Sequence, residues 1–401
     1  MMSDRFSKLG RPDGSSTFRT VVNLVMSAIG VSIFALPECF HKSGAVSSLV
    51  LLVFTAALSQ YMMHLLYLCM TKYPEAKSYP ELGLIISGRF AKLAVSISMY
   101  SGIIAISGGL IMLMGEGLHN LTNKSLTEFS WTLISAVILL PLSLLPSFKE
   151  IGIVSIIGVI ALVATLITVV AASAKHMTDY PNTSSQSSVN TTSPDYGVTL
   201  VTCFNRLMNS FTVAPVIPSL VSDMQDPRKY FKASSIGFAC IALIAGITGF
   251  SYIGFATEYD QGNATSVFGV ISSEPSLQFY ATAAQLGTVV ICMSHFLCMF
   301  APIASLVDSL SDLRVIKIVA RVLAVMVCCG IAVTVRQFGN FGKLMGIVGC
   351  LIVPFVQLIF PVVFYYLATR SGRSYGQTVM LAAVFLVGIA AFGVGILGLN
   401  S

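Results

Sequence analysis

Long tracts without charged residues are the feature that most constrains this chain. Charged residues cluster at short intervals along the 401-residue sequence and separate long, mainly apolar stretches. A helix of about 20 apolar residues crosses the roughly 30 Å hydrocarbon layer of a bilayer. Only 10% of the residues are charged, against roughly 25% in soluble domains, so a soluble chain of this length would be unable to cover its surface. The sequence therefore predicts an integral membrane protein and argues against a nucleic-acid-binding domain, a cytosolic enzyme or a disulfide-stapled secreted module.

The apolar tracts predict eleven transmembrane helices, numbered spans 1 to 11 in chain order. The clear tracts cover residues 20–37, 43–71, 93–115, 129–148, 151–174, 233–257, 275–307, 344–369 and 374–401. Two weaker tracts, 198–222 and 317–336, contain or border basic residues whose long side chains reach the headgroups. We therefore expect an all-α integral membrane protein with eleven transmembrane helices.

The distribution of Lys and Arg tests this count, because cytoplasmic loops are enriched in basic residues. With the N-terminus inside, seventeen of the 23 Lys and Arg residues fall in predicted cytoplasmic segments and five in outer segments, and Arg206 lies inside span 6. The five Asn-x-Ser/Thr sequons all fall in predicted outer loops, at Asn120, Asn123, Asn182, Asn190 and Asn263. Both patterns predict a cytoplasmic N-terminus. The sequons are candidate glycosylation sites, with chance occurrence in polar loops as the alternative.

Spans 1 and 6 contain prolines that interrupt a helix. A proline has no N–H to donate, so each one frees the carbonyl four residues earlier: Pro37 that of Ile33, Pro215 that of Phe211, and Pro218 that of Ala214. Unpaired backbone persists in a membrane only where it is buried in protein or lines a polar cavity. Breaks in the first helix of each of two five-helix halves are typical of inverted-repeat secondary transporters. Simple proline kinks in packed membrane helices are the alternative.

The breaks predict a 5+5 inverted repeat with one added C-terminal helix. The expected parts are a cytoplasmic tail (1–17), a first repeat with spans 1–5 (18–174), an external flexible loop (175–198), a second repeat with spans 6–10 (199–369) and span 11 (374–401). The loop is rich in Ser, Thr, Asn and Pro, which favours flexibility. No cleavage pattern follows the first apolar tract, so we expect span 1 to stay in the protein.

Short motifs along most of the chain resemble the amino acid/auxin permease family of eukaryotic amino acid transporters. They are Asn23…Ser27-Ala-Ile-Gly30…Ala35-Leu-Pro37 and Ser43-Gly44 in and after span 1, Leu140-Pro-Leu-Ser-Leu-Leu before span 5, Pro218…Asp223-Met-Gln-Asp226-Pro227…Phe231 at the end of span 6, Pro302 in span 8, and Phe338-Gly339…Gly346…Gly349…Pro361 in span 10. The resemblance implies the leucine-transporter fold and ion-coupled movement of amino acids.

Three positions depart from the family's pattern. Span 1 has Ser32 where the family often has the second glycine of Gly-x-Gly, and Glu38 follows Pro37 where an aromatic residue is common. In the sodium-coupled branch a span 8 hydroxyl residue contributes to the sodium site, and alignment on Pro302 puts His295 at that position, next to Ser294. This departure argues against sodium coupling and makes Ser294 and His295 the candidate ion-coupling residues.

The helix breaks also supply candidate groups for binding an amino acid. Exposed amides around Gly30, Val31 and Ser32, at the start of the outer half of span 1, suit a carboxylate, which the half-helix dipole also favours. The freed carbonyls of span 6 suit an ammonium group. The resemblance adds aromatic side chains from spans 3 and 6 that close over the substrate. The candidate substrate-binding set is Ala28, Gly30, Val31, Ser32, Tyr100, Asn209, Ser210, Phe211, Thr212 and Ala214.

Simpler interpretations exist for several of these residues. Asn209, Ser210 and Thr212 also fit ordinary polar contacts between helices, and Tyr100 also fits packing. His295 lies in a long tract without Asp, Glu, Lys or Arg, and its reference pKa of about 6.5 suits a proton carrier. A neutral His bonded to a backbone carbonyl is the alternative.

Charged and thiol side chains near the outer ends of spans 1 and 6 leave further choices open. Arg206 has three interpretations: it attracts anionic substrates, it pairs with Glu38 or Glu116, or it extends towards the outer headgroups. Cys39 and Cys203 lie near the same ends, and the sequence leaves open whether they form a disulfide, because it does not give their separation.

These observations predict a secondary active transporter that moves amino acids, neutral ones in particular, by alternating access driven by protons or, second, by sodium. The alternative is a transporter-like sensor that binds amino acid and signals, although such proteins often carry long soluble extensions. No enzyme motif is visible in the spans, so we expect no catalysis and no cofactor beyond the coupling ion. Expected partners are the amino acid and the bilayer, without nucleic acid, and a monomer is favoured. A plasma membrane and a vacuolar or lysosomal membrane fit equally well.

Overall fold

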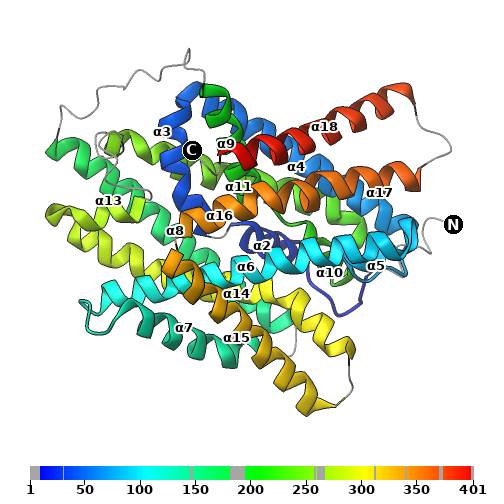
Figure 1. Ribbon diagram of the computed structural model, residues 1–401, viewed down its shortest axis with the longest axis horizontal. Helices are drawn as coiled ribbons and strands as arrows, with labels where there is room; N and C mark the ends of the chain where they lie inside the picture. The colour runs from blue at the N-terminus through cyan, green and yellow to red at the C-terminus, as the bar shows by residue number, and fades with distance from the viewer. Residues whose placement is uncertain are drawn as a thin grey trace.

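The computed structural model describes residues 10–29, 31–144, 148–180, 195–256, 259, 267–310, 313–338, 341–369 and 374–398. Every named element in these residues is a helix, and one isolated bridge joins Ser15 to Met224. Figure 1 shows the helices packed side by side in a single bundle, with the longest helices crossing most of its width.

Eight helical segments of the described residues are long and apolar enough to cross a membrane. They are α4 (Ala45–Lys72), α6 (Arg89–Leu121), α8 (Phe148–Asp179), α11 (Tyr230–Phe250), α14 (Gln278–Leu310), α15 (Arg314–Phe338), α16 (Phe341–Leu351) together with α17 (Phe360–Ala368), and α18 (Tyr375–Gly398). They differ in position: the most apolar part of α14 is 72% buried inside the protein, whereas that of α15 is 22% buried. The helix α14 therefore lies in the interior, and α15 turns most of its apolar surface outward.

The remaining predicted spans are shorter or broken. Span 1 forms α2 (Thr17–Ala28), a 3-10 turn η1 (Val31–Ala35) and α3 (Leu36–Ser43), with a bend of 50° between its two halves. Span 4 is the 16-residue helix α7 (Glu128–Ser143). Span 6 consists of α9 (Tyr196–Ser210), η3 (Ala214–Val216) and α10 (Ile217–Ser222). The all-helical membrane architecture is confirmed, whereas the count of eleven crossings, the two five-helix halves and the domain boundaries stay predictions.

Short helices connect the long ones, and local capping explains where several begin. Ser16, Ser78 and Thr127 precede α2, α5 (Tyr79–Ser87) and α7, and each side chain accepts a hydrogen bond from the amide three residues later. The other connecting elements are η4 (Pro227–Lys229), η5 (Ser251–Phe255), α13 (Val267–Ser273) and η6 (Pro275–Leu277).

Glycines let other helices approach α2 closely. A Cβ atom built on Gly158 of α8 would lie 2.5 Å from Cβ of Ser294 and 2.7 Å from Cε of Met26. A Cβ atom on Gly237 of α11 would lie 2.2 Å from Cδ2 of Leu24. Because real Cβ contacts are never this short, a larger residue at either position would push α2 away from its neighbours.

The segment before α2 is attached to the end of span 6. The Ser15 hydroxyl donates to Oδ2 of Asp223 at 2.5 Å. Backbone bonds add to this contact: Arg11 N–H donates to the Met224 carbonyl at 3.1 Å, and Gln225 N–H donates to the Ser15 carbonyl at 3.1 Å. The described part of the predicted tail is therefore fixed to the α10–η4 connection.

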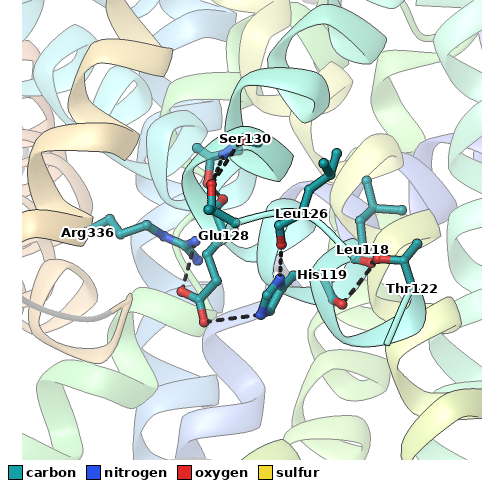
Figure 2. A network of polar contacts seen from close by, with 9 residues as sticks. Leu118, His119, Thr122, Leu126, Glu128, Ser130 and Arg336 are labelled. Carbon is teal, nitrogen blue, oxygen red and sulfur yellow. Dashed lines mark hydrogen bonds and ion pairs between the residues drawn. The ribbon is translucent and has the colours of Figure 1, made fainter. Parts of the chain in front are cut away.

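A polar cluster ties together α6, α7 and α15 at one end of the bundle (Figure 2). Glu128 Oε2 lies 3.0 Å from Nη1 of Arg336, and its other oxygen lies 3.9 Å from Nε2 of His119. His119 Nδ1 lies 2.8 Å from the Leu126 carbonyl oxygen, to which it donates. Of the candidate glycosylation sites, Asn120 lies in the last turn of α6 and Asn123 in the α6–α7 connection. The other three, Asn182, Asn190 and Asn263, lie outside the described residues.

Candidate functional site

The span 6 break leaves backbone groups outside the helical ladder, and a side chain from span 10 forms hydrogen bonds with them. The helix α9 ends at Ser210, and Pro215 provides no N–H for the Phe211 carbonyl. Instead, Gln357 Nε2 donates to that carbonyl at 3.0 Å. Ala214 N–H donates to Gln357 Oε1 at 3.3 Å. All three residues are fully buried, so one amide group satisfies both sides of the break.

Local chemistry in span 10 places Gln357 there. Between α16 and α17 the backbone forms a π-helical turn, η7 (Pro354–Ile359), in which Phe360 N–H bonds to the Phe355 carbonyl. In the same register Pro361 would be the donor to the Val356 carbonyl, but proline has no N–H. Tyr79 of α5 donates its hydroxyl to that carbonyl at 2.9 Å. Such π-helical turns frequently occur at functional sites.

The span 1 break is closed in a similar way by span 8. The last carbonyls of a helix have no partner within it, and Met26 is near the end of α2. His295 Nδ1 lies 2.5 Å from the Met26 carbonyl oxygen, and because a carbonyl only accepts, Nδ1 is the donor. His295 is buried. This contact matches the simpler interpretation of His295, a histidine bonded to a backbone carbonyl. A role of its other ring nitrogen, Nε2, in proton coupling stays a prediction.

The other predicted ion-coupling residue contacts α8. The Ser294 hydroxyl donates to the Val154 carbonyl at 3.1 Å. One residue further along α8, the Ser155 hydroxyl lies 3.2 Å from Sγ of Cys298. Ser294 and His295 thus lie where α2, α8 and α14 meet, next to Gly158.

Most side chains predicted to bind substrate have partners within the protein. The Ser210 and Thr212 hydroxyls donate to carbonyls of their own helix turn, at 3.2 Å and 2.8 Å. Asn209 Nδ2 lies 3.6 Å from Sδ of Met345 on α16. Ala28 is buried at the end of α2. These contacts match the simpler interpretation of the polar side chains, while their roles in binding stay predictions.

The predicted carboxylate contacts in span 1 are only partly described. Gly30 lies outside the described residues. Val31 and Ser32 have a described backbone in η1, but their side chains lie outside the described part. The carboxylate site at this break therefore stays a prediction.

A cavity of about 20 Å³ lies beside the span 6 break. Its walls come from α6, the break, α14 and span 10, and include Ser98, Gly102, Thr212, Pro215, Met299 and Val356. Apart from Ser98 and Thr212 the lining side chains are apolar. A water molecule needs roughly 10–15 Å³ measured in this way, so the cavity is too small for an amino acid and the surrounding helices are closed.

The two predicted aromatic lid residues are not part of this lining. The Phe211 ring packs against Phe238 of α11, with centroids 6.2 Å apart and nearly parallel planes. On α6, the cavity is lined by Met99 and Gly102, whereas the nearby Tyr100 is outside the lining. Sequence reasoning missed Gln357, although a lone amide between two prolines in an apolar span was the available signal.

An ion pair joins the two broken helices at their predicted outer ends. Arg206 of α9 lies 2.9 Å from Glu38 of α3, whose other oxygen lies 2.8 Å from Nζ of Lys42. Arg206 also donates to Sγ of Cys39 at 3.3 Å. Of the interpretations of Arg206, pairing with Glu38 is confirmed. Cys39 and Cys203 are buried free thiols in this structure, and the Ser43 hydroxyl donates to Sγ of Cys203 at 3.6 Å.

Known proteins similar in sequence to this chain are amino acid transporters. A family model described as transmembrane amino acid transporter protein matches residues 13–400. The chain is 23% identical to amino acid transporter AVT1H of Arabidopsis thaliana over 366 residues, covering 88% of this chain and 82% of that protein. It is 23% identical to AVT1J of the same plant over 395 residues, covering 94% and 89%.

Two solved structures share the arrangement of helices. MhsT in complex with L-phenylalanine superposes with a TM-score of 0.69 at 12% identity, covering 97% of this chain and 100% of that one. A substrate-bound, outward-open Na⁺-coupled sialic acid symporter superposes with a TM-score of 0.64 at 13% identity, covering 97% and 92%. At these identities the likeness concerns the fold, and the expected leucine-transporter fold is confirmed.

Proposed function

The chain belongs to the transmembrane amino acid transporter family, and from this premise we propose that it is a secondary active transporter that moves neutral amino acids by alternating access, coupled to a proton gradient. As a family member it is a multi-pass membrane transporter rather than an enzyme. The substrate class, the coupling ion and the mechanism are the parts that we propose.

The observation that carries the proposal is the pair of helix breaks held by side chains of other spans. His295 of α14 bonds the end of α2, and Gln357 of η7 bonds both sides of the span 6 break. Broken helices near the middle of a membrane supply backbone donors, acceptors and dipole ends for a substrate and its coupling ion. A small zwitterion such as an amino acid matches such groups, because it carries one acceptor and one donor of opposite charge on a single carbon.

The lining of the cavity supports neutral substrates. Met99, Ile103, Met299, Val353 and other apolar residues surround it, with Ser98 and Thr212 as the polar members. An uncompensated charge next to such a surface is costly. We therefore expect apolar and small polar amino acids to be accepted and amino acids with charged side chains to be rejected.

His295, which lies where α2, α8 and α14 meet, supports proton coupling. A buried histidine within a membrane helix is by default a functional hypothesis, and histidine is the residue type whose ordinary pKa lies close to physiological pH. Sodium is the second candidate, since the hydroxyl and carbonyl oxygens around Ser294 are the kind of ligand that a hard cation uses.

Uptake by purified protein in liposomes tests the proposal. A panel of labelled amino acids is offered under an imposed proton gradient, an imposed sodium gradient, or neither. We expect accumulation of neutral amino acids only with the proton gradient, and the absence of gradient-driven uptake of any amino acid would overturn the transporter reading. Binding detected by thermal stabilisation without uptake would instead support the alternative of an amino acid sensor.

A further inference from the structure

The Gln357 side chain satisfies two different backbone groups with the two ends of one amide. Its Nε2 donates to the Phe211 carbonyl at 3.0 Å, and its Oε1 accepts from Ala214 N–H at 3.3 Å. These groups lie three residues apart on either side of the span 6 break, and Phe211, Ala214 and Gln357 are all fully buried.

The chemistry of this pairing resembles that of the proposed substrate. An α-amino acid presents a donor, its ammonium group, and an acceptor, its carboxylate, separated by one carbon. A primary amide also presents a donor and an acceptor on one carbon. The Phe211 carbonyl is an acceptor suited to the ammonium group, and Ala214 N–H is a donor suited to the carboxylate, so Gln357 fills both halves of a zwitterion site.

We propose that Gln357 is an intramolecular placeholder that occupies the amino-acid-binding groups of the span 6 break in the closed, substrate-free protein and is displaced when the substrate binds. The inference rests on the proposed function, because it concerns the same site. The neighbouring cavity of about 20 Å³, lined by Thr212, Pro215 and Val356, supports it: an amino acid can enter only after span 10 separates from the break.

The placeholder also has a consequence for selectivity. An amine without a carboxylate can replace the donor at Phe211 but leaves Ala214 N–H unpaired, and a carboxylic acid without an ammonium group leaves the Phe211 carbonyl unpaired. Unpaired buried groups are costly. We therefore expect that neither the decarboxylated nor the deaminated analogue of a good substrate displaces Gln357.

A competing interpretation is that Gln357 is only a brace between span 10 and span 6. Both interpretations predict some loss of stability when the amide is removed. They differ in the affinity for substrate, because only a placeholder competes with it. The substitution Gln357→Met keeps the length of the side chain and removes both hydrogen bonds.

The matched control is Gln60→Met. Gln60 of α4 also bridges two helices, since its Nε2 donates to the hydroxyls of Ser234 and Ser235 on α11 at 3.1 and 3.0 Å. For Gln357→Met we expect the equilibrium Kd of the best labelled amino acid, measured without gradients, to fall about tenfold, the scale of losing two competing hydrogen bonds. For Gln60→Met we expect a Kd within about twofold of the parent's. An unchanged or raised Kd in Gln357→Met would show that the residue is a brace.

A second variant keeps the test decisive if Gln357→Met does not fold. In Gln357→Glu the protonated acid is shaped like the amide and has one O–H donor and one acceptor, whereas the ionised form has no donor for Phe211. We expect the Kd of Gln357→Glu to match that of the parent at acid pH and to fall below it as the pH rises. Parallel pH profiles for the two proteins would overturn the proposal.

A readout without substrate separates this inference from the proposed function. Ser98 lines the cavity from α6, and Ser98→Cys places a thiol there whose labelling by a small thiol reagent is followed by mass spectrometry. We expect labelling at position 98 to be about tenfold faster when Gln357→Met is combined with Ser98→Cys. Faster labelling in a protein that binds no amino acid would show that Gln357 holds the break closed and that the proposed function, rather than this closure, is wrong. Unchanged labelling would overturn the placeholder itself.

Discussion

Nδ1 of His295 lies 2.5 Å from the carbonyl oxygen of Met26, so a side chain of α14 closes the end of α2. The two residues are 269 positions apart in the sequence. The bond gives a hydrogen-bond donor to the Met26 carbonyl, which lies in the last turn of α2, where carbonyls have no partner within the helix. Because a carbonyl only accepts, the bond also requires that Nδ1 carry a proton.

Replacing His295 by Gln separates its structural role from proton coupling. A glutamine side chain still offers an N–H donor to the Met26 carbonyl, but it does not titrate. We expect His295→Gln to lose uptake driven by a pH gradient while retaining exchange of labelled for unlabelled amino acid. The control is His64→Gln on α4, where the ring packs against Phe231 and where we expect pH-driven uptake to persist. Full pH-driven uptake by His295→Gln would remove the coupling role.

The ion pair between Glu38 and Arg206 is expected to stabilise the contact between the broken helices. Their side chains are 11% and 24% exposed, and the charged atoms are 2.9 Å apart. We expect a double-mutant cycle with Glu38→Gln and Arg206→Gln to give a coupling of about 1–2 kcal/mol, between the values for exposed and buried pairs. Reversible unfolding in mixed detergent micelles provides the free energies. Additive effects of the two substitutions would contradict the prediction.

The close packing of α2 predicts opposite effects for two glycine substitutions. In Gly158→Ala the new methyl group meets Ser294 and Met26 at distances that no real contact shows, so we expect the free energy of unfolding to fall by about 1–3 kcal/mol. In Gly330→Ala on α15 the new methyl group has no atom within 4 Å, and better helix propensity should leave stability equal or slightly higher. Equal melting temperatures for the two variants would show that α8 moves aside freely.

The contact between Ser15 and Asp223 is expected to hold the N-terminal segment against the protein. Asp223→Asn weakens the bond from the Ser15 hydroxyl, by about 1 kcal/mol for a charge-assisted hydrogen bond at a partly buried site. We expect cleavage by endoproteinase Asp-N before the exposed Asp13, which lies between the bonded residues Arg11 and Ser15, to become several-fold faster. The matched control is Asp226→Asn in the same connection, because Asp226 bonds Arg228 instead of the tail. Cleavage at the parent's rate in Asp223→Asn would show that the backbone bonds alone hold the segment.

The helix breaks in spans 1 and 6 could be predicted from the sequence because they depend on the backbone chemistry of single residues. Proline has no N–H in any environment, so Pro215 frees the Phe211 carbonyl whatever packs around it. The structure has that carbonyl outside the helical ladder, with its bond coming from Gln357. The prediction that this carbonyl is available to an ammonium group did not include Gln357. The lone amide between Pro354 and Pro361 was visible in the sequence, but its contact with the span 6 break depends on how span 10 packs.

Side-chain facing was the part that the sequence did not decide. Its place near the middle of span 3 predicts that Tyr100 faces the substrate, yet Met99 and Gly102 line the cavity from that helix. A rotation of about 100° per residue separates neighbouring positions on a helix. The rotation of α6 is set by its contacts with α14, α15 and α7, and a single apolar sequence in a membrane shows little difference between its faces.

The sequence by itself determined that this chain lies in a membrane, that its spans are helical, and that spans 1 and 6 are interrupted. Those properties follow from bilayer thickness and from the backbone of single residues, which act over a few positions. Only the tertiary structure decided that His295 and Gln357 close the two interruptions and that Arg206 pairs with Glu38. These partners are far apart in the sequence, and the sum of many packing contacts brings them together.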